Sequence, residues 1–381
     1  MRGKHRRIGV ATAGVLLLAA AAIVLVRASA GGSGSDETPA PTATRAVTPT
    51  STPTLSPTAT ASPTATATAE PTPTLAPQVA LTPVGHEWQT WNNCGPATLA
   101  SALLYFGVER TQEQVAAVVK PHPDDKAVEP EELLRYADGV GVEGRVIYGG
   151  DLQTLYRLLN AGIPVIAKTW LRVGEDIGHY RLVSGYDLSS GSLLTQDSYH
   201  GPNVWVSTDD FLAMWQPFLY MYIPLYRPAD EPLAASAVGP AWEPSEMIAR
   251  ALTGAENETV SSPQNAYAWY NLGDALYLAG DVEEAVAAYE RAVAIGLPRR
   301  FFWYHYDFFT ALNATGRHER VLELTAGVLA YEPALAEVLI ERGHALRALG
   351  RNEEAAAVYQ RALEYAPDRD DVRQALSELA R

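Results

Sequence analysis

The single cysteine of the chain lies in the stretch Trp88-Gln89-Thr90-Trp91-Asn92-Asn93-Cys94-Gly95-Pro96-Ala97. Pro96 suits the first turn of a helix, because its missing N–H has no partner there. The mostly apolar run 97–106 ends before Gly107, which predicts a helix that begins close to the cysteine. Unpaired amides at a helix start favour a thiolate. We therefore predict that Cys94 is a reactive thiol and not a buried structural cysteine.

Composition limits the classes of partner and chemistry. With 381 residues the chain has room for two or three compact units. A formal net charge of -15 argues against nucleic acid, since phosphate binding needs a basic face. One cysteine excludes an internal disulfide. No pattern indicates a cofactor or a metal; His122 lies in a Pro- and Asp-containing loop and is interpreted as part of a solvated turn.

The N-terminal segment 1–30 predicts export. Basic residues at 2, 4, 6 and 7 precede an uncharged run, 8–26, which is long enough to span a bilayer with its basic flank in the cytoplasm. Residues 28–30 also fit a signal-peptidase site. A retained membrane anchor and a cleaved signal peptide therefore both stay open. In either case we expect the remaining chain outside the cytoplasm, at the cell membrane or secreted.

Two linkers are predicted to divide the exported part. Residues 31–83 are rich in Thr, Pro, Ala and Ser and lack aromatic residues, so we expect a disordered tether. In the next segment, 84–228, helix signals come first and alternating strands follow, which is an α+β pattern. Residues 229–262 are interpreted as a second linker, with one helix expected from Pro244 to Leu252. Beyond it, 263–381 is predicted to be helical.

A repeat marks this last region. Gly280, Gly316 and Gly350 recur at intervals of 36 and 34 residues. Around them, the spacing of aromatic and small residues matches the tetratricopeptide helix-turn-helix pattern, which predicts three units, a capping helix and a concave face for a protein partner. The middle unit has two inserted residues and the pair Phe308-Phe309 in place of Leu-Gly. The aromatic cluster 301–304 is assigned to packing between repeats in preference to a ligand surface.

A thiol nucleophile needs a base and a group that orients the base. His179 begins an alternating strand, and a turn after Asp187 leads into a returning strand that ends near Asp197. Such a hairpin brings the start of one strand beside the end of the next, so Asp197 can orient His179 toward Cys94. His200 is the rival base, but its neighbours indicate a turn, and we prefer His179.

An acyl-transfer site also needs donors for an oxyanion. The backbone N–H of Cys94 is one candidate, and the side-chain amide of Gln89 is the second. Trp88 and Trp91 are either walls of a substrate groove or half-buried packing residues, and the sequence does not favour one over the other.

These residues carry a resemblance. The motifs are Gln89-x4-Cys94-Gly95-Pro96-Ala97, Gly178-His179-Tyr180-x-Leu182-Val183 and Gln196-Asp197-Ser198. They resemble the bacteriocin-leader (double-glycine) peptidase-like family, family thirty-nine of the cysteine peptidases, over about 85–226. The resemblance implies a papain-like α+β fold, with Gln89 as oxyanion donor, Cys94 as nucleophile, His179 as base and Asp197 as orienter.

The expected architecture is therefore an N-terminal transmembrane helix, a disordered linker, a papain-like peptidase domain and an all-α tetratricopeptide solenoid. Leader peptidases of the family are commonly fused to an ATP-driven exporter. This chain has no phosphate-binding loop, so cleavage after a double-glycine leader is not carried over. We predict a cysteine peptidase acting on a peptide or protein. A silent peptide-binding scaffold and an acyl transferase that uses the same residues are the alternatives.

Overall fold

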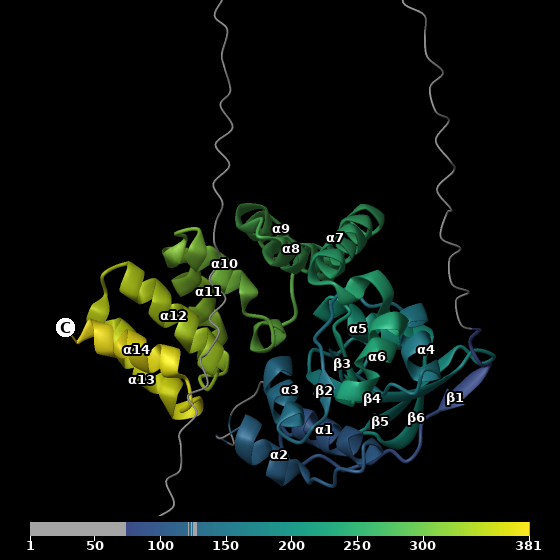
Figure 1. Ribbon diagram of the computed structural model, residues 1–381. Helices are drawn as coiled ribbons and strands as arrows, with labels where there is room; N and C mark the ends of the chain where they lie inside the picture. The colour runs from purple at the N-terminus through teal and green to yellow at the C-terminus, as the bar shows by residue number, and fades with distance from the viewer. Residues whose placement is uncertain (1–73, 121, 123, 125–127, 381) are drawn as a thin grey trace, which may run out of the picture. The chain divides into compact units, whose positions relative to one another are not determined.

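The computed structural model describes residues 74–120, 122, 124 and 128–380 (Figure 1). The predicted membrane segment 8–26 lies outside these residues, as does the linker up to residue 73. In the part of the chain that is described, no helix is long and apolar enough to cross a membrane. The predicted α+β domain followed by an all-α region is confirmed.

One antiparallel sheet organises the first domain. Its strands follow the order β2-β7-β3-β4-β5-β6, and β1 pairs with residues 185–187 at the C-terminal end of β4. Neighbouring strands on this path are antiparallel throughout. The bounds are β1 (Gln78–Ala80), β2 (Glu143–Gly144), β3 (Val165–Trp170), β4 (Gly178–Asp187), β5 (Ser192–Asp197), β6 (Gly201–Ser207) and β7 (Tyr222–Tyr226).

Strand β1 corrects one predicted boundary. Residues 78–80 were expected in the disordered linker 31–83, but they pair with β4. The next residue, Leu81, donates its N–H to the Ser184 carbonyl at 2.8 Å. Leu75, Val79 and Leu81 pack against the buried core, so the last part of the Thr- and Pro-rich stretch belongs to the folded domain.

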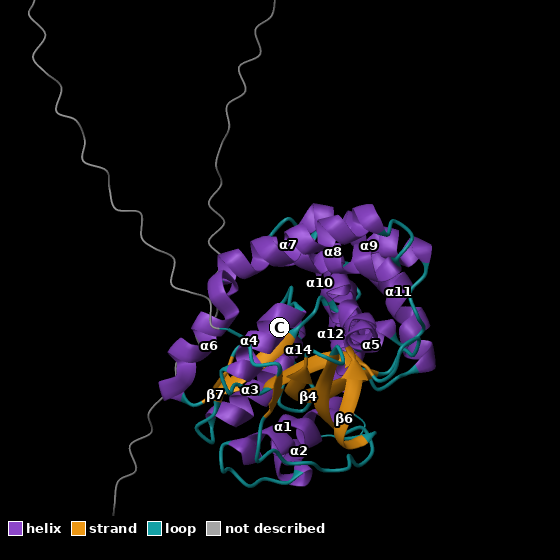
Figure 2. Cartoon of the chain, turned by 90° about the vertical axis from the view of Figure 1, so that its right-hand side faces the viewer, coloured by secondary structure: helices purple, strands orange, loops and turns teal. Residues whose placement is uncertain are grey.

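Helices cover both faces of the sheet. Alternate residues of a strand point to opposite faces, and on β3 Ile166 packs into one core while Val165 and Ala167 pack into the other. The first core includes α1, α2 and α3, and the second includes α4, α5 and α6. Figure 2 shows the strands in orange with α1 and α2 below them. The bounds are α1 (Cys94–Tyr105), α2 (Gln112–Val119), α3 (Pro130–Asp138), α4 (Leu152–Asn160), α5 (Thr208–Trp215) and α6 (Glu231–Val238).

The predicted linker 229–262 is wrong, because most of it is helical. It contains α6 and α7 (Pro244–Ser261). The helix expected at 244–252 is confirmed, but it continues to Ser261, and α6 was not expected. Small residues at helical spacing, among them Ala251 and Ala255, are buried. The Glu258 carboxylate accepts from Gln216 at 3.0 Å and also bonds the Tyr220 hydroxyl. An alanine-rich composition resembles a linker, but here it allows close packing of helices on the sheet domain.

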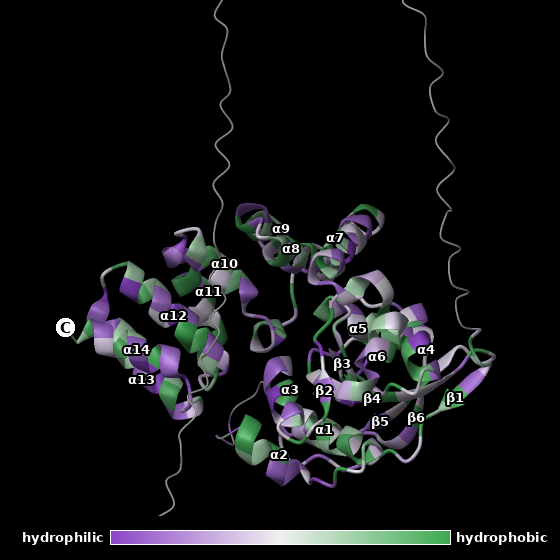
Figure 3. Ribbon diagram, viewed as in Figure 1, coloured by the Kyte–Doolittle hydropathy of each residue, from purple (hydrophilic) through white to green (hydrophobic). Residues whose placement is uncertain are grey.

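Paired helices form the C-terminal region. In Figure 3 these helices carry both hydrophobic and hydrophilic residues, as amphipathic helices do. The pairs are α8 (Ala266–Ala279) with α9 (Val282–Ile295), α10 (Asp307–Ala314) with α11 (His318–Tyr331), and α12 (Ala336–Ala348) with α13 (Asn352–Tyr365), and α14 (Asp370–Leu379) closes the array.

The packing explains why the middle unit departs from the repeat pattern. A Cβ at Gly273 would overlap the ring of Tyr289, and a Cβ at Gly343 would overlap the ring of Tyr359. In the middle unit, Phe309 stands where the glycine stands and Thr325 stands where the tyrosine stands, and both are fully buried. The large residue therefore lies on the first helix of the middle unit and the small residue on the second, which is the reverse of the other two units.

The sheet domain and the repeats share one aromatic core. Trp170, at the end of β3, lies 4.7 Å from Phe218 and 6.1 Å from Phe301 between ring centroids. His305 stacks on Phe301 at 4.0 Å and on Phe218 at 4.9 Å. Asn271 of α8 donates to the Gln216 carbonyl at 2.8 Å. The repeats are therefore packed directly on the sheet domain.

His305 makes the stability of this core depend on pH. Burial, together with the nearby charge of Lys168, lowers the pKa of His305 well below its ordinary value. Its stabilising contribution is present above the ordinary pKa of about 6.5 and is lost below it, because only the unfolded chain takes up the proton. We expect the urea concentration at the midpoint of unfolding to be lower at pH 5 than at pH 7. This decrease should be smaller in His305→Phe than in wild type.

His305 contributes at most about 1.4 kcal/mol per pH unit to the slope of the free energy of unfolding against pH. His344→Phe, on α12, is the matched control, since the His344 side chain is 41% exposed. An equal pH dependence in wild type and His305→Phe would contradict the assignment.

Candidate active site

Cys94 is the first residue of α1 and is partly exposed. Pro96 occupies the first turn, as the sequence predicts. The preceding residue, Asn93, makes no side-chain cap and instead donates to the Thr90 hydroxyl at 2.8 Å. The amides of the first helical turn therefore have no side-chain cap and face the region of the thiol.

His179 lies against the thiol. It is the second residue of β4 and is 3% exposed. Helix α1 is attached to this strand by the Thr98 hydroxyl, which donates to the Tyr180 carbonyl at 3.0 Å. This packing places His179 and Cys94 in the lining of the same cavity.

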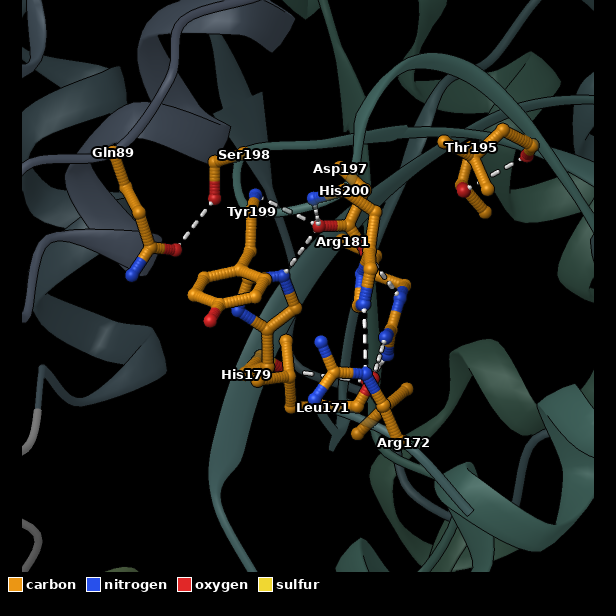
Figure 4. A network of polar contacts seen from close by, with 12 residues as sticks. Gln89, Leu171, Arg172, His179, Arg181, Thr195, Asp197, Ser198, Tyr199 and His200 are labelled. Carbon is orange, nitrogen blue, oxygen red and sulfur yellow. Dashed lines mark hydrogen bonds and ion pairs between the residues drawn. The ribbon is translucent and has the colours of Figure 1, made fainter. Parts of the chain in front are cut away.

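Asp197, at the end of β5, contacts the other side of the imidazole (Figure 4). Its Oδ1 lies 3.1 Å from His179 Nε2. A carboxylate can only accept, so Nε2 carries the proton and donates it, and Nδ1 is left to face Cys94. The hairpin of β4 and β5 thus places His179 beside Asp197, as expected from the sequence.

Arg181 completes this network, and the sequence analysis missed it. Its Nε donates to Asp197 Oδ2 at 2.8 Å, and both side chains are almost fully buried. The guanidinium also donates to the carbonyls of Trp170, at 2.7 Å, and Leu171. Arg181 follows His179 by two residues on β4, so strand alternation places both on one face. That spacing is the signal that could have revealed it.

His200 contacts the carboxylate and not the thiol. Its backbone N–H donates to Asp197 Oδ1 at 2.9 Å, and its Nδ1 lies 3.1 Å from Oδ2. The N–H of Tyr199 donates to Oδ1 at 2.8 Å. The rival base of the sequence analysis therefore belongs to the support of Asp197.

Electrostatics in this network favour a thiolate–imidazolium pair. Burial by itself raises the pKa of Cys94, but the hydrogen bond and charge of His179 outweigh it, so the pKa lies below the ordinary value. Burial disfavours charge on His179, yet its hydrogen bonds to Asp197 and Cys94 raise the pKa of the imidazole. His179 and Arg181 hold the pKa of the Asp197 carboxyl below its usual range, against the effect of burial.

Gln89 is oriented by Ser198. The Ser198 hydroxyl donates to Gln89 Oε1 at 2.9 Å, and the Gln89 N–H donates to the Ser198 carbonyl, also at 2.9 Å. Because Oε1 is engaged, the amide Nε2 remains as a donor. Gln89 and Cys94 line the same cavity. Ser198 follows Asp197 directly, so the end of β5 positions both the imidazole of His179 and the side-chain amide of Gln89.

A cavity of about 690 Å³ opens over Cys94 and His179. Trp91 lines it and is 79% exposed, whereas Trp88 is exposed outside it. The further lining residues come from the sheet domain and, unexpectedly, from the repeats; the latter are Arg300, Trp303, Tyr304 and Glu332.

Comparison with known families agrees with this geometry. Residues 77–222 match the model of the peptidase C39 like family, and residues 248–296 and 336–369 match tetratricopeptide repeat models. Residues 77–222 are a C39-like peptidase domain. The resemblance to this family and to the repeats is confirmed.

Several solved structures are similar to portions of this chain. The chain aligns with a putative C39-like peptidase from Bacillus anthracis at 18% identity and a TM-score of 0.34, covering 39% of this chain and 98% of the other. It also aligns with the peptidase domain of Streptococcus ComA, at 21% identity and a TM-score of 0.33, covering 38% of this chain and 98% of the other. MamA from Desulfovibrio magneticus RS-1 aligns at 20% identity and a TM-score of 0.32, covering 35% of this chain and 74% of the other. Among curated proteins, no match was found.

The network of the C39-like domain predicts the pH profile of thiol alkylation. Asp197→Asn removes the charge that raises the pKa of His179, so the imidazolium is lost at lower pH and the Cys94 pKa rises. Rates of reaction with iodoacetamide between pH 5 and pH 9 should show an inflection below that of free cysteine in wild type, and a shift of this inflection to higher pH in the variant.

Asp187→Asn is the matched control, because Asp187 ends the same strand and contacts Ser189 instead of the histidine. Circular dichroism checks that Asp197→Asn folds, since it leaves the Arg181 charge buried. An unchanged inflection in folded Asp197→Asn would contradict the proposed coupling.

Proposed function

We propose that this protein is a cysteine peptidase that cleaves peptide bonds through Cys94, His179 and Asp197, with Gln89 as oxyanion donor. One observation carries the proposal. Cys94 and His179 line one cavity of about 690 Å³, and His179 Nε2 lies 3.1 Å from the buried carboxylate of Asp197.

The reaction follows from these contacts. The Cys94 sulfur attacks the carbonyl carbon of the peptide bond, and the carbonyl oxygen becomes an oxyanion. The N–H of Cys94 and Nε2 of Gln89 are the donors available to it. Imidazolium Nδ1–H of His179 gives its proton to the leaving nitrogen, and the C–N bond breaks to leave a thioester. Water then attacks the thioester as His179 takes its proton, and the C–S bond breaks to release the acid and the thiolate.

Two other functions use the same cavity. An acyl transferase would pass the thioester to an amine in place of water, with the same residues. A peptide-binding scaffold would need the cavity and the repeats but not the thiolate. The lowered pKa of Cys94 favours an enzyme over a scaffold, since binding alone gives no reason to activate a thiol.

Gln89 provides a test of the chemistry. Replacing an oxyanion donor typically costs about 100- to 1,000-fold in kcat. Gln89→Ala should therefore cleave a quenched peptide library that much more slowly, while iodoacetamide still labels Cys94 at the wild-type rate. Gln374→Ala, an exposed glutamine on α14, is the control.

Cys94→Ala sets the background of this assay. A cleavage pattern shared by wild type and Cys94→Ala would refute the peptidase proposal. Products joined to an added amine, with no hydrolysis, would favour the acyl transferase.

We further propose that the C39-like domain and the repeats act outside the cytoplasm. The support is the basic flank and the apolar run 8–26 of the sequence. Mass spectrometry of the N-terminus of the membrane and secreted fractions separates the two forms. Residue 1 retained in the membrane fraction indicates an anchor, and a secreted form that starts at Gly31 indicates a cleaved signal. A protein confined to the cytoplasm would contradict the proposal.

A further inference from the structure

The connection between α9 and α10 differs from the other connections between repeats. It runs over residues 296–306, whereas the connection between α11 and α12 runs over 332–335. Helix α10 has only 8 residues, compared with 14 in α8 and 13 in α12. The residues that would begin the first helix of the middle unit instead form a short 3₁₀ helix, Phe301–Trp303, and the turn after it.

This segment is fastened to the C39-like domain beside the catalytic histidine. Asp176, three residues before His179, accepts from the Arg300 N–H at 3.0 Å and from its guanidinium at 2.7 Å. The Tyr304 ring lies against the backbone of Gly178, where a Cβ would be only 2.8 Å from the ring. Phe301 is fully buried in the shared aromatic core. Because both ends of the segment are attached, its position relative to Cys94 is well defined.

The side chains between these attachments line the active-site cavity. Trp303 and Tyr304 are partly exposed and lie in the lining with Cys94, His179 and Gln89. The indole Nε1 of Trp303 is buried and has no hydrogen-bond partner among the described residues. An aromatic surface from the repeats therefore lies beside the reacting atoms.

The Lys and Arg side chains that line the cavity are already paired. Among the described lining residues these are Lys168, Arg172 and Arg300, and each has an acidic partner. The pairs are Lys168 with Glu129 at 3.9 Å, Arg172 with Glu175 at 2.9 Å and Arg300 with Asp176 at 2.7 Å. An anionic ligand would have to compete with these pairs, whereas an apolar side chain can contact the aromatic rings without disturbing them.

We infer that the repeats complete the substrate-binding cleft, and that Trp303 and Tyr304 select a peptide with an aromatic or large aliphatic side chain next to the scissile bond. The inference rests on the proposed peptidase function. It makes the repeat region part of the active site and not only a separate site for a partner. The substrate is then a peptide segment that lies between the two regions.

The test compares two kinds of thiol probe. Iodoacetamide reports the reactivity of Cys94 alone. Peptidyl vinyl sulfones that carry Phe, Leu, Gly or Asp next to the reactive group report contacts of that side chain. Wild type should react faster with the Phe and Leu probes than with the Gly and Asp probes. Trp303→Ala should lose about tenfold of this preference, while its iodoacetamide rate is unchanged.

Two variants control for packing. Trp269→Ala removes a tryptophan from the same repeat region that does not line the cavity, and it should keep the preference. Trp303→Phe retains an aromatic ring and should restore most of it. If Trp303→Ala does not fold, a graded loss from Trp303→Phe to Trp303→Leu gives the same information.

The outcomes separate the two proposals. An unchanged preference in Trp303→Ala and Trp303→Leu, with normal iodoacetamide labelling, overturns this inference and leaves the peptidase intact. Wild-type Cys94 that reacts no faster than free cysteine with every probe overturns the peptidase and this inference together.

Discussion

The buried carboxylate of Asp197 is the interaction on which the site depends. Without partners, this buried negative charge would carry a large desolvation penalty. Arg181, His179 and backbone N–H groups just after β5 offset that penalty. Arg181 is in turn held by carbonyls at the end of β3. The carboxylate therefore connects three segments of the sheet, and it fixes the imidazole with Nδ1 toward the thiol.

A second constraint is the aromatic core that joins the C39-like domain to the repeats. Trp170 and Phe218 from one side meet Phe301 and His305 from the other. Trp170 also belongs to the segment whose carbonyls bind Arg181. The network around Asp197 and the attachment of the repeats thus share the end of β3. A change in the packing of the repeats would therefore alter the position of Trp170, which contacts Arg181, and Arg181 in turn contacts Asp197.

The middle repeat unit differs from the other two units both in its buried residues and in the length of its first helix. The first and third units place a glycine under a tyrosine ring, and the middle unit exchanges them for Phe309 and Thr325. Both residues are fully buried in the interior of the repeats. The first helix of this unit is also shorter, and residues that precede it line the cavity over Cys94.

The sequence by itself determined the α+β domain, the helical repeats, the helix start at Cys94 and the hairpin that brings His179 to Asp197. These follow from local chemistry: a proline in a first turn, strand alternation and the repeat spacing. It did not reveal Arg181, helix α6, the full length of α7, or the place of residues 301–304. Those depend on contacts between segments far apart in the chain. Arg181 needs the carbonyls of β3, buried alanines resemble linker residues until a partner surface is known, and only the docked repeats turn a packing cluster into a cavity wall.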